Sequence, residues 1–238
     1  MLPLVFAWLG AVAFAGSLSY FLFTFFVTFG APPRPGVAGG VVPVSIDVAL
    51  FSAFALHHSL FARTRLKRWM TATLPAALER AVYSWIASVL FILVCAAWQP
   101  IPGVIYSIPA PWSWIGYAAQ AGGILFTFFG ARSLDVLDLA GVRQVLLSQR
   151  RTAGASTRVP LQTGGVYGVV RHPLYFGWAL LVFGAPHMTA DRFTFAIVST
   201  FYLALAIPFE ERDLDDTFGS EYARYREHVR WRMLPGLY

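Results

Sequence analysis

Six apolar runs dominate this sequence, and most of them are long enough to cross a lipid bilayer. A membrane-spanning helix needs about 20 mostly apolar residues, and residues 2–29 contain no charged side chain at all. The runs are residues 2–29, 41–62, 81–98, 112–131, 173–185 and 193–209. They predict an all-α integral membrane protein, a helical bundle of about six transmembrane helices. The fifth run is short for a full span.

The composition agrees with a membrane protein. Hydrophobic residues make up 57% of the chain and charged residues only 13%, whereas about a quarter of an average soluble domain is charged. The length suits one bundle, so we expect a single domain over residues 1–238. Cys95 is the only cysteine, which excludes an intrachain disulfide and a cysteine metal cluster. No metal site is expected.

The basic residues predict how the helices are oriented. Sixteen of the eighteen Lys and Arg residues fall in three segments: between the second and third runs, between the fourth and fifth runs, and after the sixth run. Only Arg34 and Arg192 fall elsewhere. Because cytoplasmic loops are enriched in Lys and Arg, we expect six spans with both termini in the cytoplasm of a bacterial inner membrane. The net charge of +6 thus reflects topology and does not indicate nucleic-acid binding.

The C-terminal third contains a hairpin and an amphipathic tail. The link between the fifth and sixth runs, "PHMTAD", is short, so these two helices should be antiparallel. Within residues 210–238, apolar side chains then recur at helical spacing. This pattern predicts an amphipathic helix that lies against the membrane or folds under the bundle. Its apolar positions are Leu214, Phe218, Tyr222, Tyr225 and Val229.

An Arg-His-Pro triplet stands where the fifth run begins. Pro173 is suited to the first position of a helix because a helix N-terminus has no partner for that N–H. The other free N–H groups attract anions, and Arg171 adds a positive charge. An antiparallel hairpin would bring Glu210 and Glu211 back to this end. Acids, a cation, an imidazole and a phenol would then form one site for a ligand with both signs of charge.

These residues resemble a known family of membrane enzymes. "GVYGVVRHPLYFGW", a hydrophobic hairpin and "EERDLDDTFGSEYARYREHV" are similar to the isoprenylcysteine carboxyl methyltransferase and phospholipid methyltransferase superfamily, whose members use S-adenosylmethionine. The resemblance covers residues 159–229. The stretch around residues 55–102 resembles bacterial methanethiol S-methyltransferases and a related (NnrU-like) group named as accessory proteins of nitrogen-oxide reduction.

The resemblance implies an S-adenosylmethionine pocket in the C-terminal third. The segment 159–162 would approach it from the preceding loop, and either Glu210 or Glu211 would supply the acid. Together with Arg171, which suits the cofactor's carboxylate, the expected cofactor-binding residues are Val159, Pro160, Leu161, Gln162, Tyr167, Arg171, His172, Pro173, Leu174, Tyr175, Glu210 and Glu211.

The methyl acceptor is expected to be a small or lipophilic thiol. Isoprenylcysteine enzymes carry an arginine inside the last helix, but "LALAIPF" at residues 203–209 has no cation. A thiol must lose its proton to become nucleophilic, and we name His57, His58 and His172 as candidate catalytic bases. His57 and His58 could equally be interfacial histidines bonded to backbone or lipid headgroups.

Other functions remain open from the sequence. The acceptor could be an isoprenylcysteine or a lipid amine. The chain could also be a non-enzymatic membrane accessory protein that binds haem through one of the three histidines. A transporter is disfavoured because no inverted repeat is visible.

Overall fold

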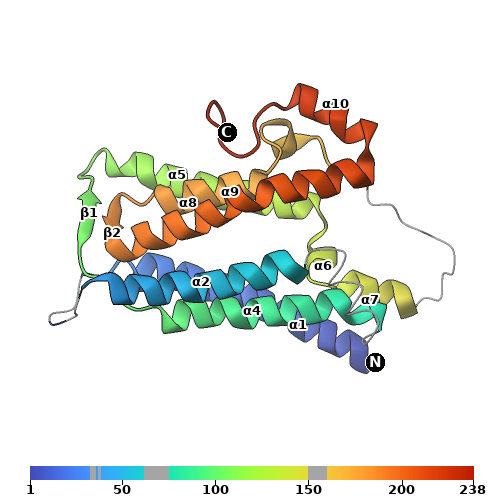
Figure 1. Cartoon of the computed structure of the whole chain (residues 1–238), viewed down its shortest axis with the longest axis horizontal. Coiled ribbons are helices and arrows are strands. Elements are labelled where there is room, and N and C mark those ends of the chain that lie inside the picture. The colour runs from blue at the N-terminus through green and yellow to red at the C-terminus, as the bar shows by residue number, and fades with distance from the viewer. Residues whose placement is uncertain (33–35, 37–38, 62–74, 150–159) are drawn as a thin grey trace. The chain divides into compact units, whose positions relative to one another are not determined.

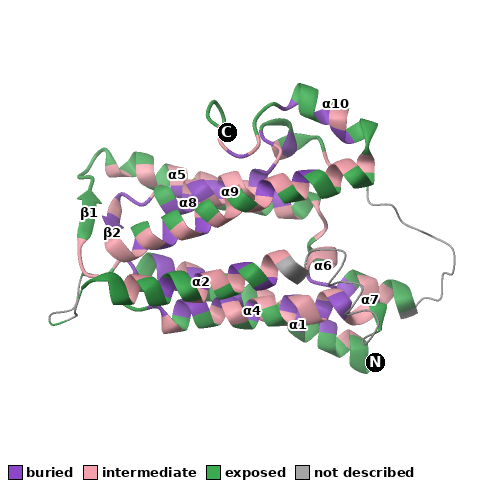
Figure 2. Cartoon of the chain, viewed as in Figure 1, coloured by how far each residue is buried: buried purple, intermediate pink, exposed green. Residues whose placement is uncertain are grey.

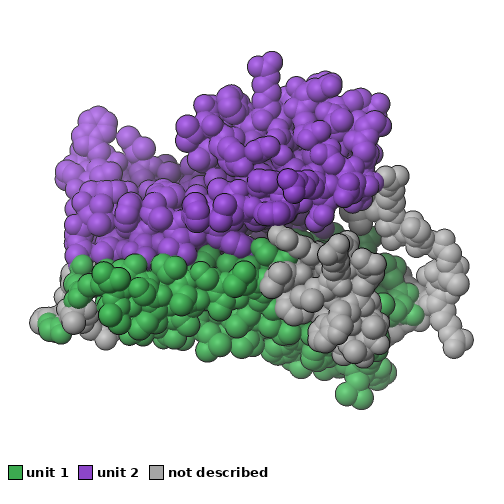
Figure 3. Space-filling model, viewed as in Figure 1, with its two compact units in different colours: residues 1–102, 135–157 green, residues 103–134, 158–238 purple. Residues whose placement is uncertain are grey.

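The structure is a computed structural model of the whole chain, and it describes residues 1–32, 36, 39–61, 75–149 and 160–238. The described chain is almost entirely helical (Figure 1). It forms two compact units, residues 1–102 with 135–157 and residues 103–134 with 158–238 (Figure 3). Each unit combines segments that are distant in the sequence. A single domain over the chain stays a prediction.

Unit 1 is built on three long apolar helices. α1 packs against α4, α2 packs against α4, and α7 packs against α1. Small residues at the centre, including Ala7, Ala81 and Ala140, bring the helices together, and Arg80 pairs with Asp138 at 3.0 Å. Its elements are α1 (Leu2–Phe23) with the π-helical turn η1 (Thr24–Thr28), α2 (Val41–Phe61), η2 (Ala76–Leu78), α4 (Glu79–Ala97), α6 (Val136–Leu139) and α7 (Val142–Gln149).

Unit 2 contains the C-terminal hairpin and the helix that packs on it. Its elements are β1 (Val104–Ser107), α5 (Ser113–Ser133), η3 (Gly165–Gly168), α8 (Pro173–Phe183), β2 (His187–Thr189), α9 (Ala190–Phe218) and α10 (Ser220–His228). The predicted hairpin of α8 and α9 is confirmed. Its link holds β2, which pairs antiparallel with β1. This small ribbon had no counterpart in the sequence analysis.

Glycines set the packing of α5 on α8. A Cβ on Gly123 would lie 2.4 Å from the Gly177 carbonyl oxygen, and one on Gly177 would lie 2.6 Å from the Gly123 oxygen. Glycine alone therefore permits this approach of the two backbones. Two other small residues of α5, Ala118 and Gly122, do not make such a contact. Ala118 is exposed, and a Cβ on Gly122 would meet nothing within 4 Å.

The sixth apolar run does not end at its acids. α9 continues through Glu210 and Glu211 to Phe218, because the acidic stretch keeps helical apolar spacing through Leu214 and Phe218. It stops at Gly219, whose φ of 54° lies in a region that favours glycine. α10 then folds back onto unit 2 through Tyr222 and Tyr225. The predicted amphipathic tail is thus split between two helices.

The helices confirm an integral membrane protein. Among the described residues, four helical stretches are long and apolar enough to span a bilayer: Leu2–Thr28, Val41–Ser59, Ala76–Ala97 and Ala190–Phe218. Exposed residues occur along all the long helices (Figure 2). Many of them are large and apolar, among them Val12, Ile115, Phe128 and Phe201. α8 is apolar but, with 11 residues, rises only about 16 Å. Six spans stay a prediction.

Candidate active site

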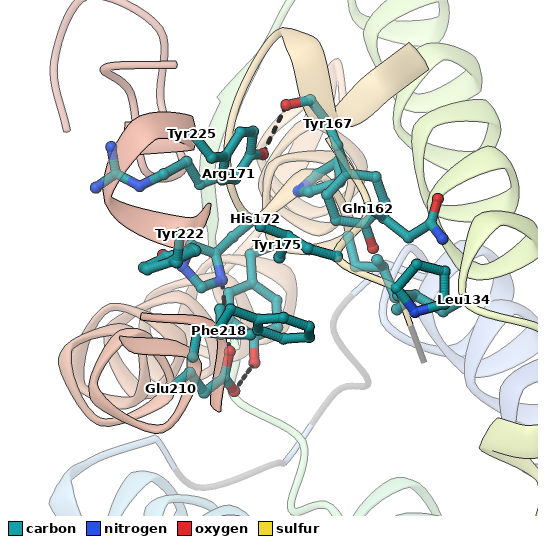
Figure 4. Close-up of a pocket in the computed structure, with 15 residues that line it drawn as sticks. Leu134, Gln162, Tyr167, Arg171, His172, Tyr175, Glu210, Phe218, Tyr222 and Tyr225 are labelled. Atoms are coloured by element: carbon teal, nitrogen blue, oxygen red, sulfur yellow. Dashed lines mark hydrogen bonds and ion pairs between the residues drawn. The ribbon is translucent and has the colours of Figure 1, made fainter. Parts of the chain in front are cut away.

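A cavity of about 290 Å³ opens in unit 2 where α8 begins and α9 nears its end. Residues from the end of α5, the segment before η3, and the helices α8, α9 and α10 line it (Figure 4). The volume is near the lower end of small-molecule sites. The lining residues are Leu134, Pro160, Leu161, Gln162, Tyr167, Arg171, His172, Pro173, Leu174, Tyr175, Glu210, Leu214, Phe218, Tyr222 and Tyr225.

A cluster of tyrosines joins α10 to the loop before α8. Tyr167, Tyr222 and Tyr225 pack together with Val229 in a buried apolar cluster. The Tyr225 hydroxyl donates a hydrogen bond to the Tyr167 carbonyl oxygen at 2.7 Å, the upper dashed line in Figure 4. This hydrogen bond joins two residues that are 58 positions apart in the sequence and that both line the cavity. α10 is therefore part of the site.

His172 lies at the centre of the polar residues. It is the residue before α8, whose first helical residue is Pro173, and its ring stacks on Tyr175 with centroids 5.4 Å apart and planes 11° from parallel. Its Nδ1 is 3.4 Å from Glu210 Oε2, and its Nε2 is 3.6 Å from Glu211 Oε1. The imidazole thus lies between two carboxylates.

The two adjacent glutamates have different surroundings. Glu210 lines the cavity, its side chain is 43% exposed, and it accepts a hydrogen bond from the Tyr175 hydroxyl (Figure 4). Glu211 has a side chain only 6% exposed and lies outside the cavity lining, where it pairs with Arg171 at 2.7 Å and with Arg232 at 3.0 Å. Glu210 is the acid that faces the cavity.

Arg171 is bound within the protein. Its Nε donates to Glu211 at 2.7 Å, and one terminal nitrogen donates to the carbonyl oxygens of Val229 and Arg230 at 2.8 and 2.7 Å. The backbone N–H groups of Arg171 and His172 donate to Trp231 and Arg232 carbonyls. The sequence suggested that Arg171 pairs with the cofactor's carboxylate. Arg171 lines the cavity, but Glu211 and the carbonyl oxygens of residues 229 and 230 already bind its guanidinium, and its contact with a cofactor stays a prediction.

The surroundings shift several pKa values. Burial acts to lower the pKa of His172, but hydrogen bonds and charges from Glu210 and Glu211 outweigh it, so the pKa rises above 6.5. Burial raises the pKa of Tyr225 to about 12 and raises that of Tyr167 as well. These phenols therefore keep their protons at neutral pH, whereas His172 gains positive charge relative to a free imidazole.

Most of the predicted cofactor residues lie around one cavity. Ten of the twelve line it, Glu211 lies behind it, and Val159 falls outside the described residues. Five further residues that line the cavity were not expected from the sequence: Leu134, Leu214, Phe218, Tyr222 and Tyr225. The last four were visible as an apolar stripe at helical spacing, which a core would also produce. Leu134 carried no signal.

The two other candidate bases belong to unit 1. His58 Nδ1 lies 2.6 Å from the Tyr83 hydroxyl oxygen, and the His57 ring stacks on the ring of Tyr83 with centroids 5.6 Å apart. Among the described residues, those that line the cavity all belong to unit 2. A catalytic role for His57 or His58 stays a prediction, while His172 is the candidate base that lines the cavity.

Comparison with known proteins identifies related enzymes. No family model matches the chain, and no solved structure matches it. The chain is 35% identical to methanethiol S-methyltransferase 2 of Bradyrhizobium diazoefficiens over 205 residues, 85% of this chain and 76% of the relative. It is 36% identical to methanethiol S-methyltransferase of Crocosphaera subtropica over 79% of this chain and 74% of the relative. A Nurim homolog of Drosophila pseudoobscura pseudoobscura is 24% identical over 78% of this chain and 75% of the relative.

These similarities extend well beyond the motif region, since residues 159–229 alone could not account for alignments of this length. They agree with the resemblance drawn from the Arg-His-Pro and Glu-Glu motifs and with the helical membrane fold. The chain therefore belongs to the methanethiol S-methyltransferase family and is an integral membrane methyltransferase.

Proposed function

We propose that this enzyme methylates a small thiol of the methanethiol class and that S-adenosylmethionine binds in the cavity of unit 2. The observation that carries the proposal is Glu210, a carboxylate held by Tyr175 and His172 at the wall of a cavity lined with aromatic rings. The relatives named methanethiol S-methyltransferase support the same chemistry.

The cavity fits the charges of this cofactor. Glu211 and the tail carbonyls engage the Arg171 guanidinium, so Glu210 dominates the charge that faces a ligand. A carboxylate suits the ammonium or ribose hydroxyl groups, and aromatic faces attract a sulfonium as they attract other cations. Tyr167, Tyr175, Phe218, Tyr222 and Tyr225 supply such rings.

When bound, S-adenosylmethionine would supply an electrophilic methyl group to a thiolate sulfur. Because the thiol must first lose its proton, we assign proton acceptance to His172. The ring nitrogen Nδ1 of His172 lies 3.4 Å from Glu210 Oε2, and Nε2 lies 3.6 Å from Glu211 Oε1. These carboxylates stabilise the imidazolium and so favour the transfer.

The apolar wall of the cavity suits a small uncharged acceptor. Leu134, Leu174, Leu214 and Phe218 line it, and such side chains exclude water from the reacting atoms. The last helix has no cation at residues 203–209 to pair with an acceptor carboxylate. Both features favour a thiol over an isoprenylcysteine.

We also propose that the cavity opens on the cytoplasmic side of a bacterial inner membrane, because the cofactor is made in the cytoplasm. Several arginines belong to the segments at the cavity end of the α8–α9 hairpin: Arg171, Arg212, Arg224, Arg226 and Arg230. Positive charge concentrates on the cytoplasmic side of membrane proteins, and this supports the assignment.

Calorimetry with the detergent-purified protein tests cofactor binding, and dimethyl sulfide in the headspace of a methanethiol assay tests the reaction. We expect saturable binding of S-adenosylmethionine and of S-adenosylhomocysteine, with both binding and turnover lost on His172→Ala. Glu227→Gln, at an exposed carboxylate of α10, is the matched control and should behave as wild type. A folded wild-type protein that binds neither compound would overturn the proposal.

A further inference from the structure

The C-terminal segment, residues 229–238, binds the two residues that precede α8. The Arg171 N–H donates to the Trp231 carbonyl oxygen at 2.9 Å, and the His172 N–H donates to the Arg232 carbonyl oxygen at 2.8 Å. A helix cannot satisfy N–H groups at its own start, and Pro173 opens α8 without one. The C-terminal segment therefore supplies the acceptors that fix the backbone carrying His172.

Glu211 ties the same segment to α8 through side chains. One carboxylate oxygen accepts from Arg171 Nε at 2.7 Å, and the other accepts from Arg232 Nε at 3.0 Å. Arg171 reaches the segment a second time through the carbonyl oxygens of Val229 and Arg230. The side chains of Arg171 and Glu211 are only 7% and 6% exposed, so water screens this ion pair little. The Arg232 side chain, at 38% exposed, forms the outer part of the network.

The segment has a compact fold of its own. The N–H groups of Met233 and Leu234 both donate to the Tyr238 carbonyl oxygen at 2.9 Å, and Arg232 donates to the Tyr238 hydroxyl at 3.2 Å. The Arg232 guanidinium lies over the Tyr238 ring, 5.2 Å from its centroid. Met233 is 2% exposed. These contacts hold Arg232 in the direction of Glu211.

We propose that the C-terminal segment, acting through Glu211 and Arg232, positions His172 and thereby sets the affinity of the cavity for the cofactor. Glu211 and Arg232 are positioning residues because neither lines the cavity. The inference rests on the proposed function. It assigns different roles to the two glutamates: Glu210 faces the ligand, and Glu211 holds His172 in position.

The test compares three substitutions in the segment. Arg232→Ala removes the contact with Glu211, Arg232→Lys keeps a cation that can pair with Glu211, and Arg230→Ala removes an exposed cation while leaving its backbone carbonyl in place. S-adenosylmethionine affinity should fall on the order of tenfold to a hundredfold in Arg232→Ala, since a displaced His172 and Glu210 would lose about one charge-assisted hydrogen bond to the ligand. Arg232→Lys should recover part of the loss, and Arg230→Ala should match wild type.

Hydrogen–deuterium exchange gives a readout independent of binding and turnover. The amides of Arg171 and His172 should exchange slowly in wild type and in Arg230→Ala, and rapidly in Arg232→Ala. Faster exchange with unchanged cofactor affinity would overturn the inference, as would wild-type exchange in Arg232→Ala. If the wild-type protein bound no cofactor, the proposed function would fail, and exchange would still decide whether the segment holds His172.

Discussion

At the scale of single residues, the paired glutamates show how neighbours in sequence take different roles. On α9, residues 210 and 211 differ by about 100° around the helix axis. Glu210 consequently faces the cavity, while Glu211 faces Arg171 and Arg232. The sequence could not distinguish them, because their side chains are identical and both follow the same apolar run.

The first prediction concerns this pair. Glu210→Gln should lower S-adenosylmethionine affinity about tenfold or more, since it removes a charge-assisted contact, and should leave thermal stability near wild type. Glu211→Gln should destabilise the fold by about 3–5 kcal/mol because it leaves buried arginine charge without its carboxylate. Calorimetry and thermal unfolding measure the two effects. Equal losses of stability in the two variants would contradict this division.

His172 gives a pH prediction. Glu210 and Glu211 raise its pKa above 6.5 against the effect of burial, so protonation of the imidazole stabilises the folded state. This contribution is fully present below pH 6.5, the unfolded value, and is lost as pH rises through the raised pKa. The difference in unfolding temperature between wild type and His172→Gln should therefore shrink on going from acidic to alkaline pH. A difference that grew with pH would refute the assignment.

At the scale of elements, the contact between α5 and α8 determines where the cavity forms. Gly123 and Gly177 bring the two backbones together, and a Cβ on Gly130, one turn before Leu134, would lie 2.9 Å from the Leu174 side chain. Leu134 thereby reaches the cavity opposite the start of α8. The sequence showed several glycines in this run but did not show which face of α5 they would occupy.

Substitution of neighbouring glycines tests this contact. Gly123→Ala should destabilise the protein by about 1–3 kcal/mol, the usual effect of overpacking, because the new Cβ meets the Gly177 backbone. Gly122→Ala, one residue earlier on the same helix, should be neutral or stabilising by up to about 1 kcal/mol through helix propensity. Thermal unfolding in one detergent compares them, and equal stabilities would exclude the close contact as the cause.

At the scale of the whole molecule, the protein is a membrane enzyme, and the described residues that line its candidate site belong to unit 2. β1 and β2 form at the opposite end of the α8–α9 hairpin from the cavity, because β2 lies in the link between the helices. The two ends of the hairpin should therefore face opposite sides of the membrane.

Cysteine labelling checks this orientation. In a Cys95→Ser background, a membrane-impermeant maleimide applied to spheroplasts should label Ile105→Cys in β1 and should not label Ser220→Cys at the start of α10, because α10 lies at the cavity end. Both native side chains are exposed, so access through the membrane decides the result. Labelling of Ser220→Cys alone would reverse the proposed orientation.

The sequence by itself determined the class of fold and the hairpin, and it indicated most of the residues that line the candidate cavity. Long uncharged runs can satisfy their backbone polar groups in a bilayer only as helices, so the apolar pattern led to α1, α2, α4 and α9. The Arg-His-Pro and Glu-Glu motifs gathered at one end because a short link forces α8 and α9 to be antiparallel. Ten of the residues that line the cavity were expected from these motifs together with the family resemblance.

Only the tertiary structure decided which contacts each side chain makes at the cavity end of the α8–α9 hairpin. In the folded protein, Arg171 binds Glu211 and the C-terminal segment. Glu210 faces the cavity, and Leu134 and the tyrosines of α10 line its walls. Local sequence patterns fix which face of a helix is apolar, but they do not fix the helix's rotation against its neighbours. That rotation depends on contacts between residues far apart in the chain, such as Arg171 with Arg230 and Gly123 with Gly177.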